Sequence, residues 1–383
     1  MTHGMVSAPQ PEAVEAGLDI LQAGGNVVDA AVGAALVQTA VDPQMCGIAG
    51  FGSMHLYLAD RDVHTCIDFH GRAPLATRPD MWEDLIVREC DDGFGFVLKG
   101  EVNELGYQSM TTPLTIKAFD EALSRFGSRS LAEMLAPAIA YCEDGFAVRP
   151  GVHGFWTRGA EAGRIARIRG LTDDPATAKI YTKADGSIRG VGEILRNPDM
   201  ARTYRRIAEH GVADFYGGGI AKQIDADMRA NGGLITLEDL ASCETETIDP
   251  LWTDYRGYRV ATNQPPGGGL MIILMLNILE NFDLAAMGHN SADYIATVSE
   301  AMKIATVDKD ARMGDPRFFD IPFDEPMSKD YARAMAERIK RGEKTPVPRM
   351  NPGGNDSKET THICVADRSD NCVTMTHSLG SSS

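Results

Sequence analysis

The sequence predicts an α+β fold in which helices cover layered β-sheets, and three patterns lead to this prediction. Apolar residues recur at helical spacing near both ends of the chain. Between them, side-chain character alternates along two runs, Ser53–Leu58 and Val63–Phe69. The turn residues 60–62 separate these runs, as in a hairpin. A second pair of runs, His362–Asp367 and Cys372–Leu379, is rich in β-branched and small apolar residues. Helices before and after paired strands favour sheets covered by helices.

The other elements are expected in the following order. A first helix carries Val14, Leu18 and Leu21 and ends at 24–26, and a helix of small residues follows at 29–41. After the hairpin, we expect helices at 113–126, 130–144, 236–241, 270–280 and 329–341, a mostly helical stretch at 151–230 and a strand at 255–261. The clearest helix is expected to begin at Asn290, with Met302 in its apolar stripe.

The composition is that of a globular protein and argues against two classes of partner. With 383 residues and 43% hydrophobic content, the chain is long enough for one large or two medium domains. It carries 54 acidic and 37 basic residues, for a net charge of −17. Such a surface repels phosphate backbones and anionic lipids, so we expect no nucleic-acid and no membrane partner. The longest apolar run, around 270–279, is shorter than the ~20 residues of a spanning helix.

The start of the chain and its cysteines bear on the compartment. The first residues lack the basic and apolar regions of a signal peptide, so we expect a cytoplasmic protein, or a periplasmic or secreted one if a signal was trimmed. Seven scattered cysteines without a CxxC pair indicate free thiols rather than a zinc site or a disulfide framework. His55, His64 and His70 have no carboxylate at ligand spacing, and we expect neither a metal nor another cofactor.

A candidate nucleophile lies where a loop meets a strand. Residues 342–359 contain three prolines and three glycines, which is loop composition, and Thr360 comes directly before the expected strand. Cleavage of the Glu359–Thr360 bond would give Thr360 a free α-amine, which can act as the general base for its own hydroxyl. Threonines at the start of a strand are also ordinary β-sheet composition, so these residues alone leave both interpretations open.

Long segments of the chain carry a family resemblance. They are GMVSAPQPEAVEAGLDILQAGGNVVDAAVGAALVQTAVDPQMCGIAGFGSMHLYL from Gly4, ITLEDL from Ile235, DYRGYRV from Asp254, PPGGGLMIILMLNILENFDL from Pro265, HNSADYIATVSEAMKIATVDKDARMGDP from His289 and TTHICVADRSDNCVTMTHSLGSSS from Thr360. In this order they resemble the γ-glutamyltransferase (γ-glutamyl transpeptidase) family over essentially the whole chain. Thr360 falls at the processing point of that family.

The resemblance implies an N-terminal-nucleophile (Ntn) hydrolase, a four-layer αββα sandwich made as one precursor that cleaves itself between Glu359 and Thr360. Residues 1–359 would then be the large-subunit region, and residues 360–383 the start of the small subunit. Thr360 would be the catalytic nucleophile, which moves a γ-glutamyl or similar acyl group from an amide such as glutathione to water or an amine. Ser378 falls on the second hydroxyl residue of the family, which hydrogen-bonds to the nucleophile.

Two departures from the family pattern concern substrate binding. His70, in the motif DFHGRAP, occupies the position of the arginine that holds the substrate's carboxylate. Arg72 lies two residues further on, where it would face the same side of a strand and either replace that arginine or remain a surface charge. Gly380 replaces an asparagine of the family. These substrate-binding candidates favour, as an alternative, an Ntn amidohydrolase or acylase with a non-glutamyl substrate. An unprocessed, non-catalytic subunit is a further alternative.

The expected partners follow from the same resemblance. Only 24 residues are counted from Thr360 to Ser383, whereas the small subunit of the family is longer and supplies the oxyanion hole and the site for the substrate's amine. We therefore expect the remainder of the small subunit as a heterodimer partner from one precursor, an incomplete sandwich without it, and no activity for this chain alone. The other expected partner is a small amide or peptide substrate.

Overall fold

The computed structural model describes residues 3–91, 93, 95–160, 163–347 and 360–380. The chain divides into two units, residues 1–63, 67–246 and 351–383 in the first and residues 64–66 and 247–350 in the second, within those limits. The described residues contain both helices and strands, so the predicted α+β class is confirmed.

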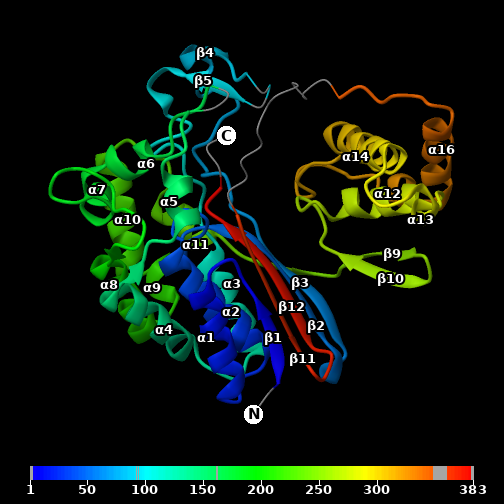
Figure 1. The fold of residues 1–383 in the computed structure, drawn as a ribbon. Helices are drawn as coiled ribbons and strands as arrows, with labels where there is room; N and C mark the ends of the chain where they lie inside the picture. Colours follow the sequence, from blue (N-terminus) through cyan, green and yellow to red (C-terminus); the bar gives the residue numbers. More distant parts are fainter. Residues whose placement is uncertain (1–2, 92, 94, 161–162, 348–359, 381–383) are drawn as a thin grey trace. The chain divides into compact units, whose positions relative to one another are not determined.

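A six-stranded sheet contains the hairpin predicted at 53–69 and the strand pair predicted at 362–379 (Figure 1). Its order is β1-β11-β12-β2-β3-β8. The bounds of these strands are Gly4–Ser7 for β1, Thr361–Asp367 for β11, Cys372–Ser378 for β12, Phe51–Leu58 for β2, Val63–Phe69 for β3 and Glu246–Ile248 for β8. The pairs β1–β11, β11–β12 and β12–β2 are antiparallel. The last two strands of the described chain therefore lie between its first strand and the hairpin β2–β3.

One face of this sheet is buried against helices. Along β12, Val373, Met375 and His377 are buried while the residues between them are partly exposed, and Ile363 and Val365 of β11 are buried on the same face. This is the alternation of a strand with one face in the core. The expected strand pair at 362–379 and the hairpin at 53–69 are confirmed.

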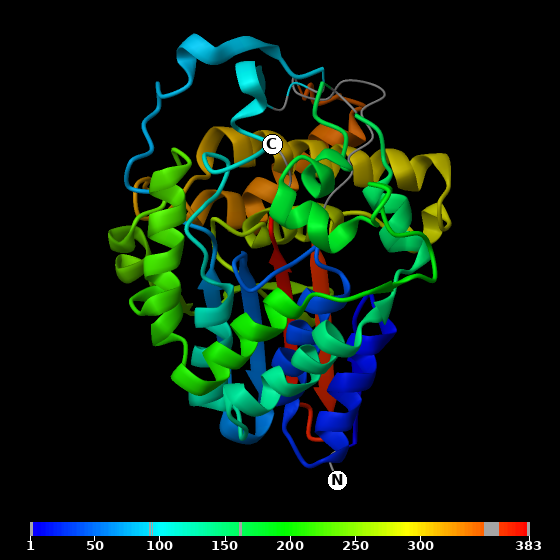
Figure 2. The same cartoon turned by 90° about the vertical axis from the view of Figure 1, so that its left-hand side faces the viewer.

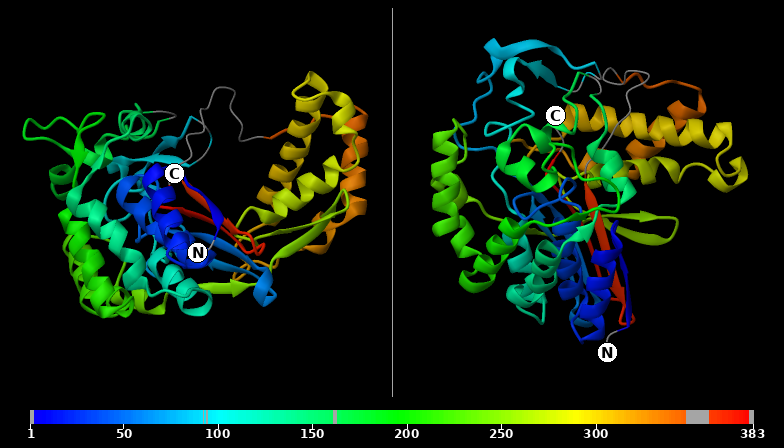
Figure 3. Two further views of the ribbon diagram at one scale, coloured as in Figure 1. Left: turned by 60° about the horizontal axis from the view of Figure 1, so that its bottom comes forward. Right: turned by 60° about the vertical axis from the view of Figure 1, so that its left-hand side comes forward.

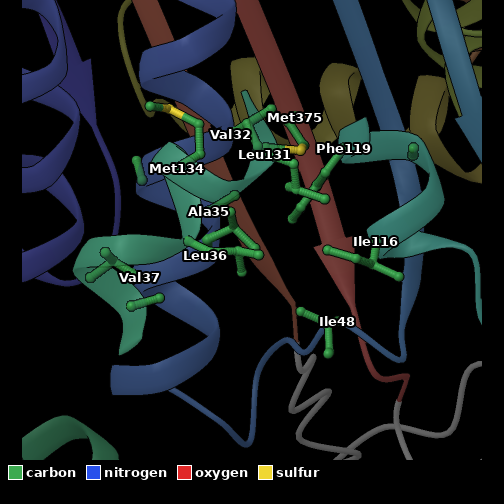
Figure 4. Close-up of a cluster of buried hydrophobic side chains, with 14 of the residues drawn as sticks. Val32, Ala35, Leu36, Val37, Ile48, Ile116, Phe119, Leu131, Met134 and Met375 are labelled. Atoms are coloured by element: carbon green, nitrogen blue, oxygen red, sulfur yellow. The ribbon is translucent and has the colours of Figure 1, made fainter. Parts of the chain in front are cut away.

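Four helices cover that face: α1 (Pro11–Gln22), α2 (Val27–Val41), α3 (Thr115–Phe126) and α4 (Leu131–Asp144). Figures 2 and 3 show these helices beside the strands from other directions. All fifteen residues of α2 are buried, because α2 lies between the sheet and the helices α1, α3 and α4. Figure 4 shows this core, in which α2, α3, α4 and β12 each contribute labelled side chains. Each large apolar side chain buried here stabilises the fold by about 1.5–3 kcal/mol.

The start of α2 is fixed by a buried carboxylate. Asn26 caps the helix, and the Asp29 carboxylate accepts a hydrogen bond from the Asn26 backbone N–H at 2.8 Å. Asp29 also accepts from the backbone N–H and the hydroxyl of Ser128 and from the backbone N–H of Arg129. Asn26 is therefore the N-cap of α2, whereas the sequence pattern places it at the end of the first helix.

The remaining elements of the first unit are mostly helical, as expected for residues 151–230. They are η1 Ala59–Arg61, η2 Glu83–Leu85, β4 Ile86–Glu89, β5 Phe96–Leu98, η3 Lys99–Glu101, β6 Phe146–Ala147, α5 Pro150–Trp156, α6 Arg169–Thr172, α7 Pro175–Tyr181, β7 Ile194–Leu195, α8 Pro198–His210, α9 Ala213–Tyr216, α10 Gly219–Ala230 and α11 Leu237–Ser242.

The second unit combines a hairpin with a small cluster of helices. Its elements are β9 Leu251–Tyr255, β10 Tyr258–Thr262, α12 Gly269–Leu279, α13 Leu284–Met287, α14 Ala292–Arg312, α15 Asp324–Met327 and α16 Lys329–Lys340. Its core is formed by α12, α14 and α16, with Leu274, Ile278, Ile304 and several alanines buried between them. In the described part of the chain, no helix is both long enough and apolar enough to cross a membrane.

Three sequence expectations for this unit were wrong in detail. Tyr255 ends β9 and does not begin the next strand, because a turn with positive φ at Arg256 separates β9 from β10. The long helix α14 has Ser291 as its N-cap, whereas Asn290 lies outside it with a φ of 57°. Met302 is 52% exposed, so it does not belong to the buried stripe of α14.

Candidate active site

The ends of four neighbouring strands lie side by side and form one edge of the sheet, the edge that runs across the strands. Because β11, β12 and β2 alternate in direction, the start of β11, the end of β12 and the start of β2 lie at the same end. The short connection from β2 to β3 brings the end of β3 to that edge as well. The residues at this edge are Thr360 before β11, Ser378 at the end of β12, Phe51 at the start of β2 and His70 after β3.

Thr360 and Ser378 are brought within hydrogen-bonding distance. The Thr360 hydroxyl donates to Ser378 Oγ at 3.3 Å, and the backbone N–H of Gly380 donates to the same oxygen at 2.9 Å. Ser378 is only 5% exposed, whereas Thr360 is exposed. The serine is therefore held by its surroundings and orients the hydroxyl of an accessible threonine. Glu359, the expected partner of Thr360 in cleavage, lies outside the described residues.

His70 is held by a carboxylate and an aromatic ring. Asp68 accepts from the backbone N–H of His70 at 3.2 Å, and its other oxygen lies 2.7 Å from His70 Nδ1. The Phe51 ring stacks on the imidazole, with 6.4 Å between the ring centroids. The bond to Asp68 fixes Nδ1 toward the carboxylate, so Nε2 is the ring nitrogen that faces away from it.

Arg72 has partners other than these residues. Its backbone pairs with Thr112, and its guanidinium donates to Glu246 Oε1 at 2.8 Å and to the carbonyl of Glu244 at 3.2 Å. The expectation that Arg72 and His70 share a strand was wrong, because β3 ends at Phe69. The charge of Arg72 is therefore balanced by Glu246, and its partners differ from those of His70.

Gly380 lies against Phe51. It has a φ of 83°, and a Cβ added there would lie 3.2 Å from Phe51 Cε1. Gly50, just before Phe51, allows β2 to approach β12, since a Cβ there would lie 2.2 Å from the carbonyl oxygen of Ser378. Phe51 therefore links Gly380, Ser378 and His70 at one edge of the sheet.

Sequence reasoning missed three residues of this region: Phe51, Asp68 and Glu246. The two-residue spacing from Asp68 to His70 was a usable signal, because it lets the carboxylate reach the imidazole. Phe51 and Glu246 could not be found in this way, since Phe51 meets its partners through strand pairing and Glu246 begins β8, which is distant in the sequence.

A buried histidine lies next to the hydroxyl pair. His377 is fully buried, directly opposite Thr361 in the sheet, and its ring meets Phe119 edge-on at 5.6 Å. Neither ring nitrogen of His377, nor Thr361 Oγ1, has a hydrogen-bond partner among the described residues. Burial lowers the pKa of His377 to about 3, so its imidazole is neutral at physiological pH.

The described part of the chain contains no candidate metal site. No three or more histidine, cysteine, aspartate or glutamate side chains there are arranged to hold a metal ion. All seven cysteines are free thiols.

Comparison with known proteins identifies the relatives of this chain. A family model described as Gamma-glutamyltranspeptidase matches residues 13–382. The glutathione hydrolase proenzyme of Escherichia coli (strain K12) is 35% identical over 382 residues, which cover 98% of this chain and 63% of the relative. The acylase ACY 1 proenzyme of Pseudomonas sp. (strain SE83) is also 35% identical, over 99% of this chain and 65% of the relative. The chain thus spans less than two thirds of the length of these two curated relatives.

Solved structures agree with the sequence relatives. The gamma-glutamyltranspeptidase of Helicobacter pylori superimposes with a TM-score of 0.80 at 28% identity, over 94% of this chain and 98% of that chain. The cephalosporin acylase of Bacillus halodurans gives a TM-score of 0.80 at 30% identity, over 99% of this chain and 66% of that chain. The Ntn-hydrolase fold predicted from the resemblance is therefore confirmed, and the chain belongs to the gamma-glutamyltranspeptidase family.

Proposed function

We propose that this chain is part of a self-processing acyltransferase or hydrolase in which Thr360 is the nucleophile. The observation that carries the proposal is the hydrogen bond from the exposed Thr360 hydroxyl to the buried Ser378, at the start of a central strand. Ser378 accepts from Gly380 as well, which fixes the acceptor before any substrate binds. The proenzyme relatives support the same assignment.

In the processing step, Thr360 Oγ attacks the carbonyl carbon of Glu359. The bond from that carbon to the Thr360 nitrogen breaks, and the resulting ester is opened by water. The products are a carboxylate at Glu359 and a free α-amine at Thr360. Residues 1–359 and the segment that begins at 360 would then be the large-subunit region and the start of the small subunit.

In turnover, the new α-amine accepts the proton of the Thr360 hydroxyl as Oγ attacks the carbonyl carbon of an amide substrate. The leaving amine takes a proton, and the acyl group remains on Oγ as an ester. Water or a second amine then removes it, which gives hydrolysis or transfer. Covalent catalysis divides one difficult amide displacement into two easier steps. Ser378 contributes by holding Oγ in place.

Two substrate classes are in keeping with the relatives. A γ-glutamyl amide such as glutathione is the first candidate, since one relative is named a glutathione hydrolase proenzyme. An amidohydrolase or acylase with a non-glutamyl substrate is the second, since another relative is named an acylase and His70 and Gly380 depart from the family pattern.

An unprocessed, non-catalytic subunit is the alternative to both enzymes. The experiment on Thr360 and Thr361 separates it from them.

The proposal includes a partner and a compartment. The remainder of the small subunit would supply the oxyanion hole and the site for the substrate's amine, which implies a heterodimer made from one precursor. The free cysteines support a reducing, cytoplasmic compartment.

Adjacent threonines provide a matched test of the proposal. In the complete protein, Thr360→Val should abolish both self-cleavage and amide turnover, because it replaces the hydroxyl by a methyl group of similar size. Thr361→Val should leave both intact, since Thr361 Oγ1 is buried without a hydrogen-bond partner among the described residues. Intact mass and release of p-nitroaniline from acyl anilides measure the two outcomes. Normal cleavage and turnover in Thr360→Val would refute the assignment.

A further inference from the structure

The charged side chains near His70 already have hydrogen-bond partners. Both carboxylate oxygens of Asp68 are engaged by His70, one by its backbone N–H and the other by Nδ1. The guanidinium of Arg72 is paired with Glu246 at 2.8 Å. A free amino-acid head, with one ammonium and one carboxylate, would have to compete for these partners and lose its own hydration.

The spacing of the strands sets how far an acyl group can extend. Thr360 precedes β11 and His70 follows β3, and these strands are separated in the sheet by β12 and β2. Neighbouring strands lie about 4.8 Å apart, so the two backbones are about 14 Å apart along the edge. Thr360 Oγ1 bonds to Ser378 at the end of β12 and the His70 ring stacks with Phe51 at the start of β2, so both side chains turn toward the two strands between them. The span matches the length of a short acyl chain. Such a chain would pass Gly380 and Phe51.

Between Thr360 and His70 the sheet carries the aromatic ring of Phe51. Phe51 presents Cε1 and Cζ, the far edge of its ring, toward Gly380, which has no side chain to cover that edge. On another side the Phe51 ring stacks with the His70 imidazole. Two planar rings next to a glycine favour a planar group, because stacked or edge-on aromatic contacts add to the free energy of burial.

We propose that Phe51 and His70 form a subsite for the end of the acyl group remote from the scissile bond, and that this subsite takes an uncharged planar group, such as a phenyl ring, in place of an amino-acid head. The inference deepens the proposed acyl transfer at Thr360 and rests on it. Asp68 acts as a positioning residue, since it fixes the imidazole plane against the Phe51 ring.

Two donors with the same leaving group test the inference in the complete, processed protein. The p-nitroanilides of the γ-glutamyl group and of the 4-phenylbutanoyl group share a four-carbon acyl chain. They differ only in whether its last carbon carries an ammonium and a carboxylate or a phenyl ring. We expect kcat/KM to be about tenfold or more higher for the 4-phenylbutanoyl donor. A higher kcat/KM for the γ-glutamyl donor would overturn the subsite while leaving acyl transfer at Thr360 in place.

Substitutions of Phe51 separate substrate binding from a structural effect. Phe51→Leu should lower kcat/KM for the 4-phenylbutanoyl donor about tenfold through KM, a larger loss than for the γ-glutamyl donor, and Phe51→Tyr should restore it. Tyr57→Leu removes an aromatic ring from the other end of the same strand and should alter neither donor. An equal loss for both donors in Phe51→Leu, without rescue by tyrosine, would contradict the inference.

His70→Arg provides the converse test. A guanidinium has more donors than Asp68 can accept, so the variant should shift the preference toward the γ-glutamyl donor. An unchanged ratio of the two kcat/KM values would also contradict the inference. If neither donor acylates Thr360 in wild-type protein, as judged by the mass of the fragment that begins there, the proposed function itself fails together with the subsite.

Discussion

The Ser378 hydroxyl accepts hydrogen bonds from both the candidate nucleophile and the backbone at Gly380. Ser378→Ala should therefore slow self-cleavage and amide turnover by about 10–100-fold, because Thr360 Oγ loses its fixed acceptor and the Gly380 N–H loses its partner. Rates of precursor disappearance and of p-nitroaniline release measure the effect. Ser378→Thr, which keeps the hydroxyl, is the control and should stay near wild type. Wild-type rates in the alanine variant would remove Ser378 from the mechanism.

His377 makes the stability of the fold depend on pH. Burial lowers its pKa in the folded protein from 6.5 to about 3, so between these values the unfolded chain binds a proton that the folded chain does not. Above pH 6.5 this difference does not affect stability. As the pH falls from 6.5 toward 3, it lowers the free energy of unfolding by about 1.4 kcal/mol per pH unit.

His377→Phe keeps a ring in the core and removes the titration. Its free energy of unfolding, measured by urea denaturation from pH 7 to pH 4, should fall less on acidification than that of the wild type. Parallel curves for the two proteins would show that His377 is not buried as a neutral imidazole.

At the scale of elements, the buried N-cap of α2 contributes strongly to the stability of the fold. Asp29→Ala should lower the free energy of unfolding by about 3 kcal/mol or more, since backbone N–H groups of Asn26, Ser128 and Arg129 lose their acceptor inside the protein. Glu133 has the same capping role at the exposed start of α4, and Glu133→Ala should cost less than about 1 kcal/mol. Urea denaturation of both variants makes the comparison. Equal losses would mean that burial adds nothing to this cap.

Local patterns predicted the elements that depend on local contacts. The hairpin β2–β3, the helix α2 and the strands β11 and β12 each carry their own periodicity, and the sequence located them within a few residues. The hairpin β9–β10 was predicted as one strand, because the turn at Arg256–Gly257 lies inside a continuous strand-like run. The predicted start of α14 was wrong by one residue, because Asn290 and Ser291 are both polar residues that can cap a helix.

The candidate site was predictable to a smaller extent. Thr360 was a candidate from its place between a loop and a strand, and the resemblance singled it out as the nucleophile. Ser378 and His70 were found because the resemblance gave their positions. Their neighbour Phe51 was missed, because its contacts with Gly380 and His70 arise from the order of strands in the sheet. Single-sequence patterns carry no information on that order.

At the scale of the whole molecule, the proposed processing boundary does not separate two units of the fold. Strands β11 and β12, which follow Thr360, pair with β1 on one side and with β2 on the other, within the first unit. Cleavage before Thr360 would therefore leave the new chain held by backbone hydrogen bonds and by the apolar contacts of Ile363, Val365, Val373 and Met375. The two fragments should remain associated without a covalent link.

The most direct measurement is end-group sequencing of the purified, complete protein after incubation. The account predicts two fragments that elute together, one of which begins Thr-Thr-His from Thr360. A protein that turns over acyl anilides while the bond between Glu359 and Thr360 stays intact would contradict it.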